Sequence, residues 1–170
     1  MVRIDIVLGR KTYEIFEAYW PYESENDPIA RTLNAAKKHV TSRTLKSLQW
    51  SNSSVVGGDI VSAIIALKVQ PGHDLQFIGS GYLIQTLQAA SLIDEYNVWA
   101  YPVVLGRGKR LFETGARPCA LRLVASKVST NDVVMSPYVP AGDIPLGSLS
   151  QTEPSAKELT RRAKMATDAT

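Results

Sequence analysis

The order of its predicted strands and helices restricts the fold of this chain more than any other feature. Short runs rich in branched residues predict strands at 2–8, 39–41, 55–56, 75–78 and 94–104. Amphipathic runs between them predict helices at 12–20, 28–36, 60–67 and 83–90. Strands that alternate with helices are typical of a parallel sheet, so we predict an α/β fold with a mostly parallel sheet flanked by helices.

Two further runs, 120–127 and 132–139, alternate apolar and polar residues and are separated only by a polar turn. We therefore predict that residues 119–139 form an antiparallel strand pair at the edge of the sheet.

The length of 170 residues and the 45% hydrophobic content suit one folded domain. From residue 141 onward the composition changes, because residues 141–155 hold Gly, Pro, Ser and Asp with no apolar period. We expect the domain to occupy residues 1–140. Residues 141–170 are predicted to be a flexible tail with a short polar helix at 155–166.

Charge and composition argue against several classes of partner. The net charge is only +3, and its one local cluster is Arg161, Arg162 and Lys164 in the tail, so we expect no nucleic-acid partner. Cys119 is alone, and His39 and His73 have no ligand-like spacing, so we expect neither a disulfide nor a metal site. No apolar run reaches membrane-spanning length and no signal peptide is evident, so we expect a cytoplasmic protein without a membrane partner.

Glycine-bearing turns at strand ends are the candidate binding sites. Gly9-Arg10-Lys11-Thr12 and Gly79-Ser80-Gly81-Tyr82 each follow a predicted strand and open a helix. The amides at a helix N-terminus suit a phosphate, and glycine lets the ligand approach the backbone. Each turn taken singly is also compatible with an ordinary connection. Gly79-Ser80-Gly81 is not a Rossmann fingerprint, because position 84 is Ile84 where a third glycine is required.

Two other turns have contrasting chemistry. Gly57-Gly58-Asp59 also joins a strand to a helix, but the carboxylate of Asp59 would repel phosphate, so we interpret it as an N-cap. Ser42 and Arg43 follow another strand and offer a hydroxyl and a guanidinium that suit a 2′-phosphate, unless this is a plain solvated turn.

The sequence identifies no catalytic residue. It contains no Gly-x-Ser-x-Gly elbow. The adjacent carboxylates of Asp94 and Glu95 would point to opposite faces of a strand. We interpret them as a cap and a surface charge rather than as an acid–base pair.

Five segments together resemble one family. They are VLGRKTYEIFEAYWP (7–21), DPIARTLNAAKKHVTSRTL (27–45), VVGGDIVSAIIALK (55–68), DLQFIGSGYLIQTLQAASLIDEY (74–96) and PVVLGRGKRLFE (102–113). Their order resembles the bacterial dihydrofolate-reductase-like family, which includes the reductase domain of the bifunctional deaminase-reductase of riboflavin biosynthesis. The resemblance extends from about Val7 to Pro140, and it implies a three-layer dihydrofolate-reductase-like fold with antiparallel edge strands.

The resemblance also implies an activity and a cofactor. Members of this family bind NADPH and transfer its hydride to a small heterocyclic or sugar-derived substrate. Ser42 and Arg43 would hold the adenosine 2′-phosphate. The residues implied along the other phosphates are Gly9, Arg10 and Thr12 in the first turn and Gly79, Ser80, Gly81, Tyr82 and Leu83 in the pyrophosphate loop.

The chain departs from the family pattern at its start. In the family, a strand, a loop and a helix precede the Gly-Arg-x-Thr motif, whereas Gly9 stands near the start here. We therefore expect an N-terminally truncated domain with a vacant central sheet position. A neighbouring strand, the 141–170 tail or a second chain are the alternatives for filling that position.

Three hypotheses of function follow. The first is an NADPH-dependent reductase of the dihydrofolate reductase or 5-amino-6-(5-phosphoribosylamino)uracil reductase type, with the substrate left open. The second is a non-catalytic nucleotide-binding or structural member of the same fold. A third is a flavin- or nucleotide-modifying enzyme of another fold. We also expect a homodimer, because the segment from Pro102 to Phe112 carries apolar residues with no evident cover.

Overall fold

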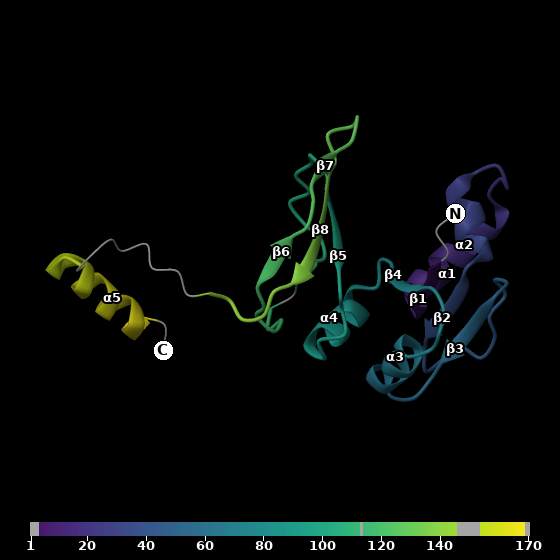
Figure 1. Ribbon diagram of the computed structural model, residues 1–170, viewed down its shortest axis with the longest axis horizontal. Coiled ribbons are helices and arrows are strands. Elements are labelled where there is room, and N and C mark those ends of the chain that lie inside the picture. Colours follow the sequence, from purple (N-terminus) through teal and green to yellow (C-terminus); the bar gives the residue numbers. More distant parts are fainter. Residues whose placement is uncertain (1–3, 113, 146–153, 169–170) are drawn as a thin grey trace.

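The computed structural model describes residues 4–112, 114–145 and 154–168, and their strands form two sheets (Figure 1). The first half of the chain alternates strands and helices, as predicted. Its elements are β1 (Ile4–Gly9), α1 (Arg10–Glu17), η1 (Trp20–Tyr22), α2 (Pro28–Ala35), β2 (Lys37–Thr41), β3 (Ser53–Val56), α3 (Ile60–Lys68), β4 (Asp74–Phe77) and α4 (Gly81–Ala89). The second half contains β5 (Tyr96–Ala100), β6 (Leu121–Leu123), β7 (Lys127–Val128), β8 (Val134–Pro140) and α5 (Ala156–Asp168).

The first sheet is wholly parallel and has the strand order β3-β2-β1-β4. Val7 on β1 lies opposite His39 on β2 and Phe77 on β4. Residues 4 to 8 of β1 are all buried, which is expected for a central strand of a sheet that is covered on both faces.

Helices cover this sheet in two layers. On one face Ile4, Ile6 and Leu8 pack with Tyr13 of α1 and Leu33 of α2 in one apolar cluster. On the other face a second cluster joins Val7 of β1 to α3 and α4 through Ile64, Leu83 and Leu87. The predicted three-layer α/β architecture is confirmed.

Local sequence explains the helix boundaries but not every exposed face. The Asp27-Pro28 pair predicts an N-cap followed by a proline in the first turn of α2, and this is confirmed, because Asp27 accepts hydrogen bonds from the amides of Ile29 and Ala30. The helix predicted over 12–20 is shorter, because α1 ends at Glu17. The helical spacing also predicts that Ile15 and Tyr19 widen the buried face of this helix, but both side chains are exposed, and that prediction was wrong.

The second sheet is antiparallel, with the order β5-β8-β6 and with β7 also paired to β8. The predicted antiparallel arrangement within residues 119–139 is confirmed, although its first strand is divided into β6 and β7. The long strand predicted over 94–104 is limited to β5. Among the described residues no strand pairs with the outer edge of β4 or of β5, and the strands therefore form two sheets where we expected one.

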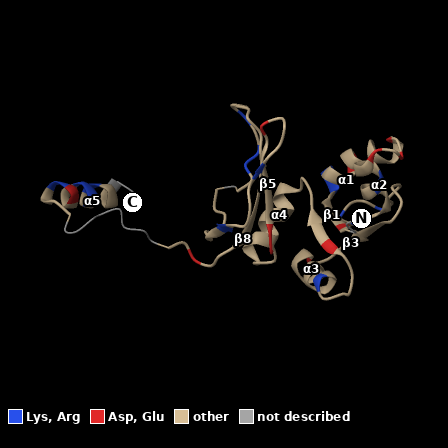
Figure 2. Ribbon diagram, turned by 45° about the horizontal axis from the view of Figure 1, so that its top comes forward, with Lys and Arg blue, Asp and Glu red and all other residues tan. Residues whose placement is uncertain are grey.

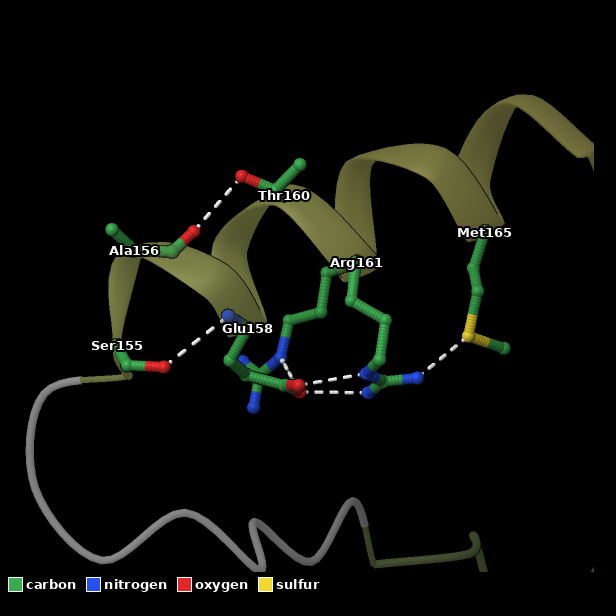
Figure 3. Close-up of polar contacts among 7 residues, drawn as sticks. Ser155, Ala156, Glu158, Thr160, Arg161 and Met165 are labelled. Atoms are coloured by element: carbon green, nitrogen blue, oxygen red, sulfur yellow. Dashed lines mark hydrogen bonds and ion pairs between the residues drawn. The ribbon is translucent and has the colours of Figure 1, made fainter.

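Helix α5 confirms the polar helix predicted near the end of the chain and lies apart from both sheets (Figures 1 and 2). Its first turn is held locally, because the carboxylate of Glu158 binds the guanidinium groups of Arg161 and Arg162 at 2.7 and 2.9 Å (Figure 3). These guanidinium groups lower the pKa of Glu158 to about 2. Residues 146–153 and 169–170 of the predicted tail lie outside the described residues, and its flexibility stays a prediction.

Length and hydropathy of a helix determine whether it can span a membrane. Within residues 4–112, 114–145 and 154–168, no helix is long and apolar enough to cross a bilayer.

A buried lysine on β2 makes hydrogen bonds to backbone carbonyls of the neighbouring segments. Lys38 is fully buried, and its ammonium donates to the carbonyl oxygens of Asn34, Ala36 and Ser51 at 3.0, 2.8 and 3.0 Å. The ammonium also lies 4.3 Å from the centroid of the Trp50 ring. Two of the carbonyls belong to the C-terminal end of α2, where a positive charge is favourable. Burial nevertheless lowers the pKa of Lys38 to about 8.

We predict that Lys38→Met lowers the free energy of unfolding at pH 7 by about 3 kcal/mol, because buried carbonyls lose their donor. Urea denaturation measures this loss. In the unfolded chain Lys38 keeps its proton up to about pH 10.5, so between about pH 8 and 10.5 the unfolded state binds more protons than the folded state. The stability of the wild type therefore rises with pH in this window relative to Lys38→Met. A pH-independent difference between the two proteins would contradict the lowered pKa.

Candidate functional site

The strand order reverses at one point of the parallel sheet, where open α/β folds form their binding crevice, and we call this position the crevice. All four strands run in the same direction, so their carboxyl ends share one edge. The chain passes from β1 outward to β2 and β3, then returns to place β4 on the other side of β1. In open α/β sheets, ligands bind at the carboxyl edge where the strand order reverses in this way. The reversal lies between β1 and β4, where the turns beginning at Gly9 and Gly79 follow the strands.

The helices that begin at this crevice differ from the others in their capping. Asp27 and Asp59 cap α2 and α3 with their carboxylates. By contrast, no side chain caps the N-terminus of α1 or of α4, and neither helix has an acidic residue in its first turn. The first-turn amides of a helix have no acceptor within the helix, and together they favour an anion. The two helix ends that remain available to an anion are therefore the two at the reversal point.

The two turns are in direct contact through Ser80. The amide of Gly9 donates to Ser80 Oγ at 2.8 Å, and Ser80 Oγ lies 3.1 Å from Thr12 Oγ1 and 3.3 Å from the carbonyl oxygen of Ile78. The structure thus brings together two turns that are 70 residues apart in the sequence. Their contact was not predictable from either motif alone.

The residues of the α4 turn divide into exposed and buried groups. The side chain of Tyr82 is 84% exposed, whereas Leu83 is 6% exposed and packs in the cluster around Val7. Ile84 makes the first helical bond, to the carbonyl of Ser80, so the amides of Tyr82 and Leu83 precede the helical ladder. Leu83 can therefore serve a ligand through its amide, while its side chain belongs to the core.

Ser42 and Arg43 lie in the turn after β2, next to β1 in the sheet. Ser42 Oγ accepts hydrogen bonds from the amides of Thr44 and Leu45 at 3.1 and 3.0 Å, which leaves the hydroxyl hydrogen for another acceptor. Arg43 is exposed, and among the described residues its guanidinium has no ion-pair partner. This turn therefore offers two donors at the same sheet edge as the crevice.

Two other predicted positions have local roles. The guanidinium of Arg10 pairs with Glu14, one turn along α1, at 2.8 Å. Asp59 accepts a hydrogen bond from the amide of Ser62 at 2.9 Å, and its bonds to Ser62 lower the pKa of its carboxyl. The interpretation of Asp59 as an N-cap is confirmed.

The carboxylates of Asp94 and Glu95 are not brought together as a catalytic pair. Asp94 binds the ammonium of Lys68, and Glu95 accepts from the side-chain amide of Asn97 at 2.9 Å. Both contacts lie at the surface, which agrees with the surface charge that we predicted, but neither is the capping bond that we also predicted.

Sequence reasoning missed one polar cluster. Asp5 lies within a buried strand, and its carboxylate is 3.2 Å from His73 Nδ1 and 3.8 Å from His39 Nε2. The signal was the one acidic residue in the apolar run of β1, but nothing in the sequence linked it to two distant histidines. Among the described residues, no group of three or more His, Cys, Asp or Glu side chains is arranged to hold a metal ion.

A cavity of about 400 Å³ lies away from the crevice, at the C-terminal end of α4. Its lining includes Gln88, Tyr96, Arg117 and Cys119. None of the predicted binding turns contributes to it. We place the candidate site at the turns, because the open helix ends and the strand reversal coincide there.

Comparison with known proteins identifies relatives of most of the chain. A family model described as the RibD C-terminal domain matches residues 5–135. Uncharacterized protein YyaP of Bacillus subtilis (strain 168) is 30% identical over 140 residues, which cover 80% of this chain and 74% of the relative. Uncharacterized protein YwjB of the same organism is 25% identical over 122 residues, which cover 72% and 66%.

Solved structures share the fold. A candidate riboflavin biosynthesis protein from Shewanella sp. PV-4 superposes with a TM-score of 0.65 at 23% identity, covering 82% of this chain and 75% of that one. A pyrimidine reductase-like protein from Corynebacterium diphtheriae gives 0.53 at 12% identity, covering 82% and 76%. RibD from Acinetobacter baumannii gives 0.52 at 16% identity, covering 81% and 47%.

We predict that Gly79→Ala lowers the free energy of unfolding by about 1–2 kcal/mol, because the φ of +66° at Gly79 is a left-handed conformation. The added methyl would also lie 3.3 Å from Thr12 Cγ2, between the two turns. Gly81→Ala is the matched control, because nothing lies within 4 Å of its added methyl and its φ is not positive. Urea denaturation of both variants checks the prediction. Equal effects would show that the conformation at Gly79 does not matter.

Proposed function

Because this chain belongs to the RibD C-terminal domain family, we propose that it is an NADPH-dependent reductase that transfers a hydride to a small heterocyclic substrate. Family membership supports a reductase of the riboflavin-pathway kind. Use of NADPH and the heterocyclic class of the substrate are the parts that we add.

The observation that carries the proposal is the pair of open helix N-termini at the reversal point of the sheet. A dinucleotide has a pyrophosphate, which requires several donors close together. The turn before α1 and the turn before α4 supply such donors from opposite faces of the sheet, and the contact between Gly9 and Ser80 holds them together. We assign the pyrophosphate to this junction, with the free amides of Tyr82 and Leu83 among its donors.

The turn after β2 accounts for the preference for NADPH. The adenosine 2′-phosphate distinguishes NADPH from NADH and carries close to two negative charges. The guanidinium of Arg43 is free to bind it, and the hydroxyl of Ser42 has a hydrogen to donate. When bound, NADPH supplies the hydride, while the residues of this chain bind and orient the cofactor.

The alternative is a non-catalytic member of the same fold. The outer edges of β4 and β5, which no strand within the described residues pairs with, favour it, because they leave the sheet divided beside the crevice. Titration with NADPH, followed by tryptophan and cofactor fluorescence, separates the hypotheses. Binding with turnover of a heterocyclic substrate supports the reductase, and tight binding without turnover of any heterocycle supports the alternative. Absence of binding rejects both.

We also propose that the chain forms a homodimer through its antiparallel sheet. In this sheet and its loops, the described residues include eleven exposed large apolar side chains between Trp99 and Val134, while only Tyr96 and Ser136 are buried. A concentration of exposed large apolar side chains in one part of a protein indicates an interface. A second copy is the occupant that we favour, because a two-fold axis would pair the free edges of two β5 strands antiparallel to each other.

The dimer predicts a mass of twice 18.6 kDa in light scattering at high micromolar protein. Val104 is 99% exposed in the apolar segment, and we expect Val104→Glu to shift the protein toward the monomer by burying a charge at the interface. Val69→Glu, at an exposed valine on the parallel-sheet side, is the control. A wild-type mass of 18.6 kDa would contradict the homodimer.

We predict that Arg43→Ala weakens NADPH binding about ten- to a hundredfold, or ~1.4–2.8 kcal/mol, because the 2′-phosphate loses charge-assisted hydrogen bonds. NADH lacks this phosphate and should bind almost unchanged. Ser42→Ala should show the same selectivity more weakly. Lys46→Ala removes an exposed positive charge from the same loop and controls for net charge. Equal losses for NADPH and NADH would assign Arg43 to the fold, and no loss for either would place the phosphate elsewhere.

A further inference from the structure

Hydrogen-bond capacity distinguishes the two serines of the candidate site. A serine hydroxyl has one hydrogen to donate and two lone pairs to accept with. Ser42 accepts two backbone amides and keeps its hydrogen. Ser80 accepts the amide of Gly9, and its single hydrogen is directed to Thr12 Oγ1 or to the carbonyl of Ile78. Either arrangement of Ser80 leaves no hydrogen for a phosphate.

Burial also keeps the hydroxyl of Ser80 away from a ligand. Ser80 is 7% exposed, although it stands at the N-cap of α4, the position where a serine side chain ordinarily bonds the helix amides. Its hydroxyl makes no capping bond and reaches across to β1 instead. The hydroxyl of Ser80 thus joins two turns and does not cap α4, and this leaves the N-terminus of α4 open.

We infer that Ser80 is a positioning residue, whose hydroxyl joins the turn before α1 to the turn before α4 and does not itself contact the cofactor. We call the hydrogen bond from the amide of Gly9 to Ser80 Oγ the clasp. The inference rests on the proposed function, since the clasp matters to a ligand that bridges both turns. Its physical effect is pre-organisation: with the two sets of donors already held together, binding does not have to order them.

The first test measures the clasp without any ligand. In Ser80→Ala the amide of Gly9 loses its acceptor, so we expect its hydrogen exchange, followed by NMR, to accelerate about tenfold or more. Thr12→Val removes the neighbouring hydroxyl but leaves the bond between Gly9 and Ser80, so the Gly9 amide should stay protected. Ser136→Ala, at an equally buried serine on β8, is the matched control and should leave Gly9 unchanged. Unchanged exchange at Gly9 in Ser80→Ala would overturn the clasp.

The second test links the clasp to the ligand. We expect Ser80→Ala to weaken NADPH and NADH alike, about five- to tenfold, because both cofactors share the pyrophosphate that bridges the turns. Arg43→Ala, by contrast, is expected to affect NADPH selectively. Unaltered affinity for both cofactors in Ser80→Ala, with Gly9 exchange accelerated, would overturn the positioning role while the clasp stands.

Measuring both Gly9 exchange and cofactor affinity distinguishes failure of this inference from failure of the proposed function. A wild-type chain that binds neither cofactor would overturn the proposed function, and with it the ligand part of this inference. The Gly9 exchange would still decide whether Ser80 joins the turns. Thermal unfolding of Ser80→Ala verifies that this variant still folds. If it does not fold, the clasp is tested by hydrogen exchange of the Gly9 amide in the wild type and in Thr12→Val. Rapid exchange of this amide in the wild type would overturn the clasp.

Discussion

The burial of β1 on both faces is the constraint on which the rest of this structure depends. Its five buried residues from Ile4 to Leu8 face two helical layers, and its two edges pair with β2 and β4. A shift by one residue would exchange the side chains that meet the two helical layers, Ile4, Ile6 and Leu8 on one face and Val7 on the other, so the register is strongly specified. That register brings the ends of β2, β1 and β4 to one edge, where the turns with donor groups follow.

Capping then decides which parts of this edge can meet an anion. The carboxylates of Asp27 and Asp59 occupy the N-termini of α2 and α3. The ends of α1 and α4 are without such caps, because Gly9 has no side chain and the hydroxyl of Ser80 is directed away from its own helix. The asymmetry concentrates the positive potential of the helix ends at the reversal point of the sheet.

The antiparallel sheet depends on a different kind of support. The two apolar clusters described here both belong to the parallel half of the molecule, and β5 to β8 contribute only Tyr96 and Ser136 to the buried residues. A sheet must bury one face to be stable. Its exposed apolar side chains and the free edge of β5 therefore connect the fold of this half to association with another chain.

The sequence by itself determined the order of the elements, the caps at Asp27 and Asp59, and the turns that hold glycine, because these follow from local periodicity and local hydrogen bonding. It also suggested Ser42 and Arg43 as donors through their place after a strand. Tertiary structure decided what depends on contacts between distant segments. Pairing of β1 with β4 joined Gly9 to Ser80, and packing assigned the side chain of Leu83 to the core. Asp5 acquired one histidine from β2 and another from the residue just before β4 for the same reason: side chains far apart in the chain meet only when the register of the sheet is set.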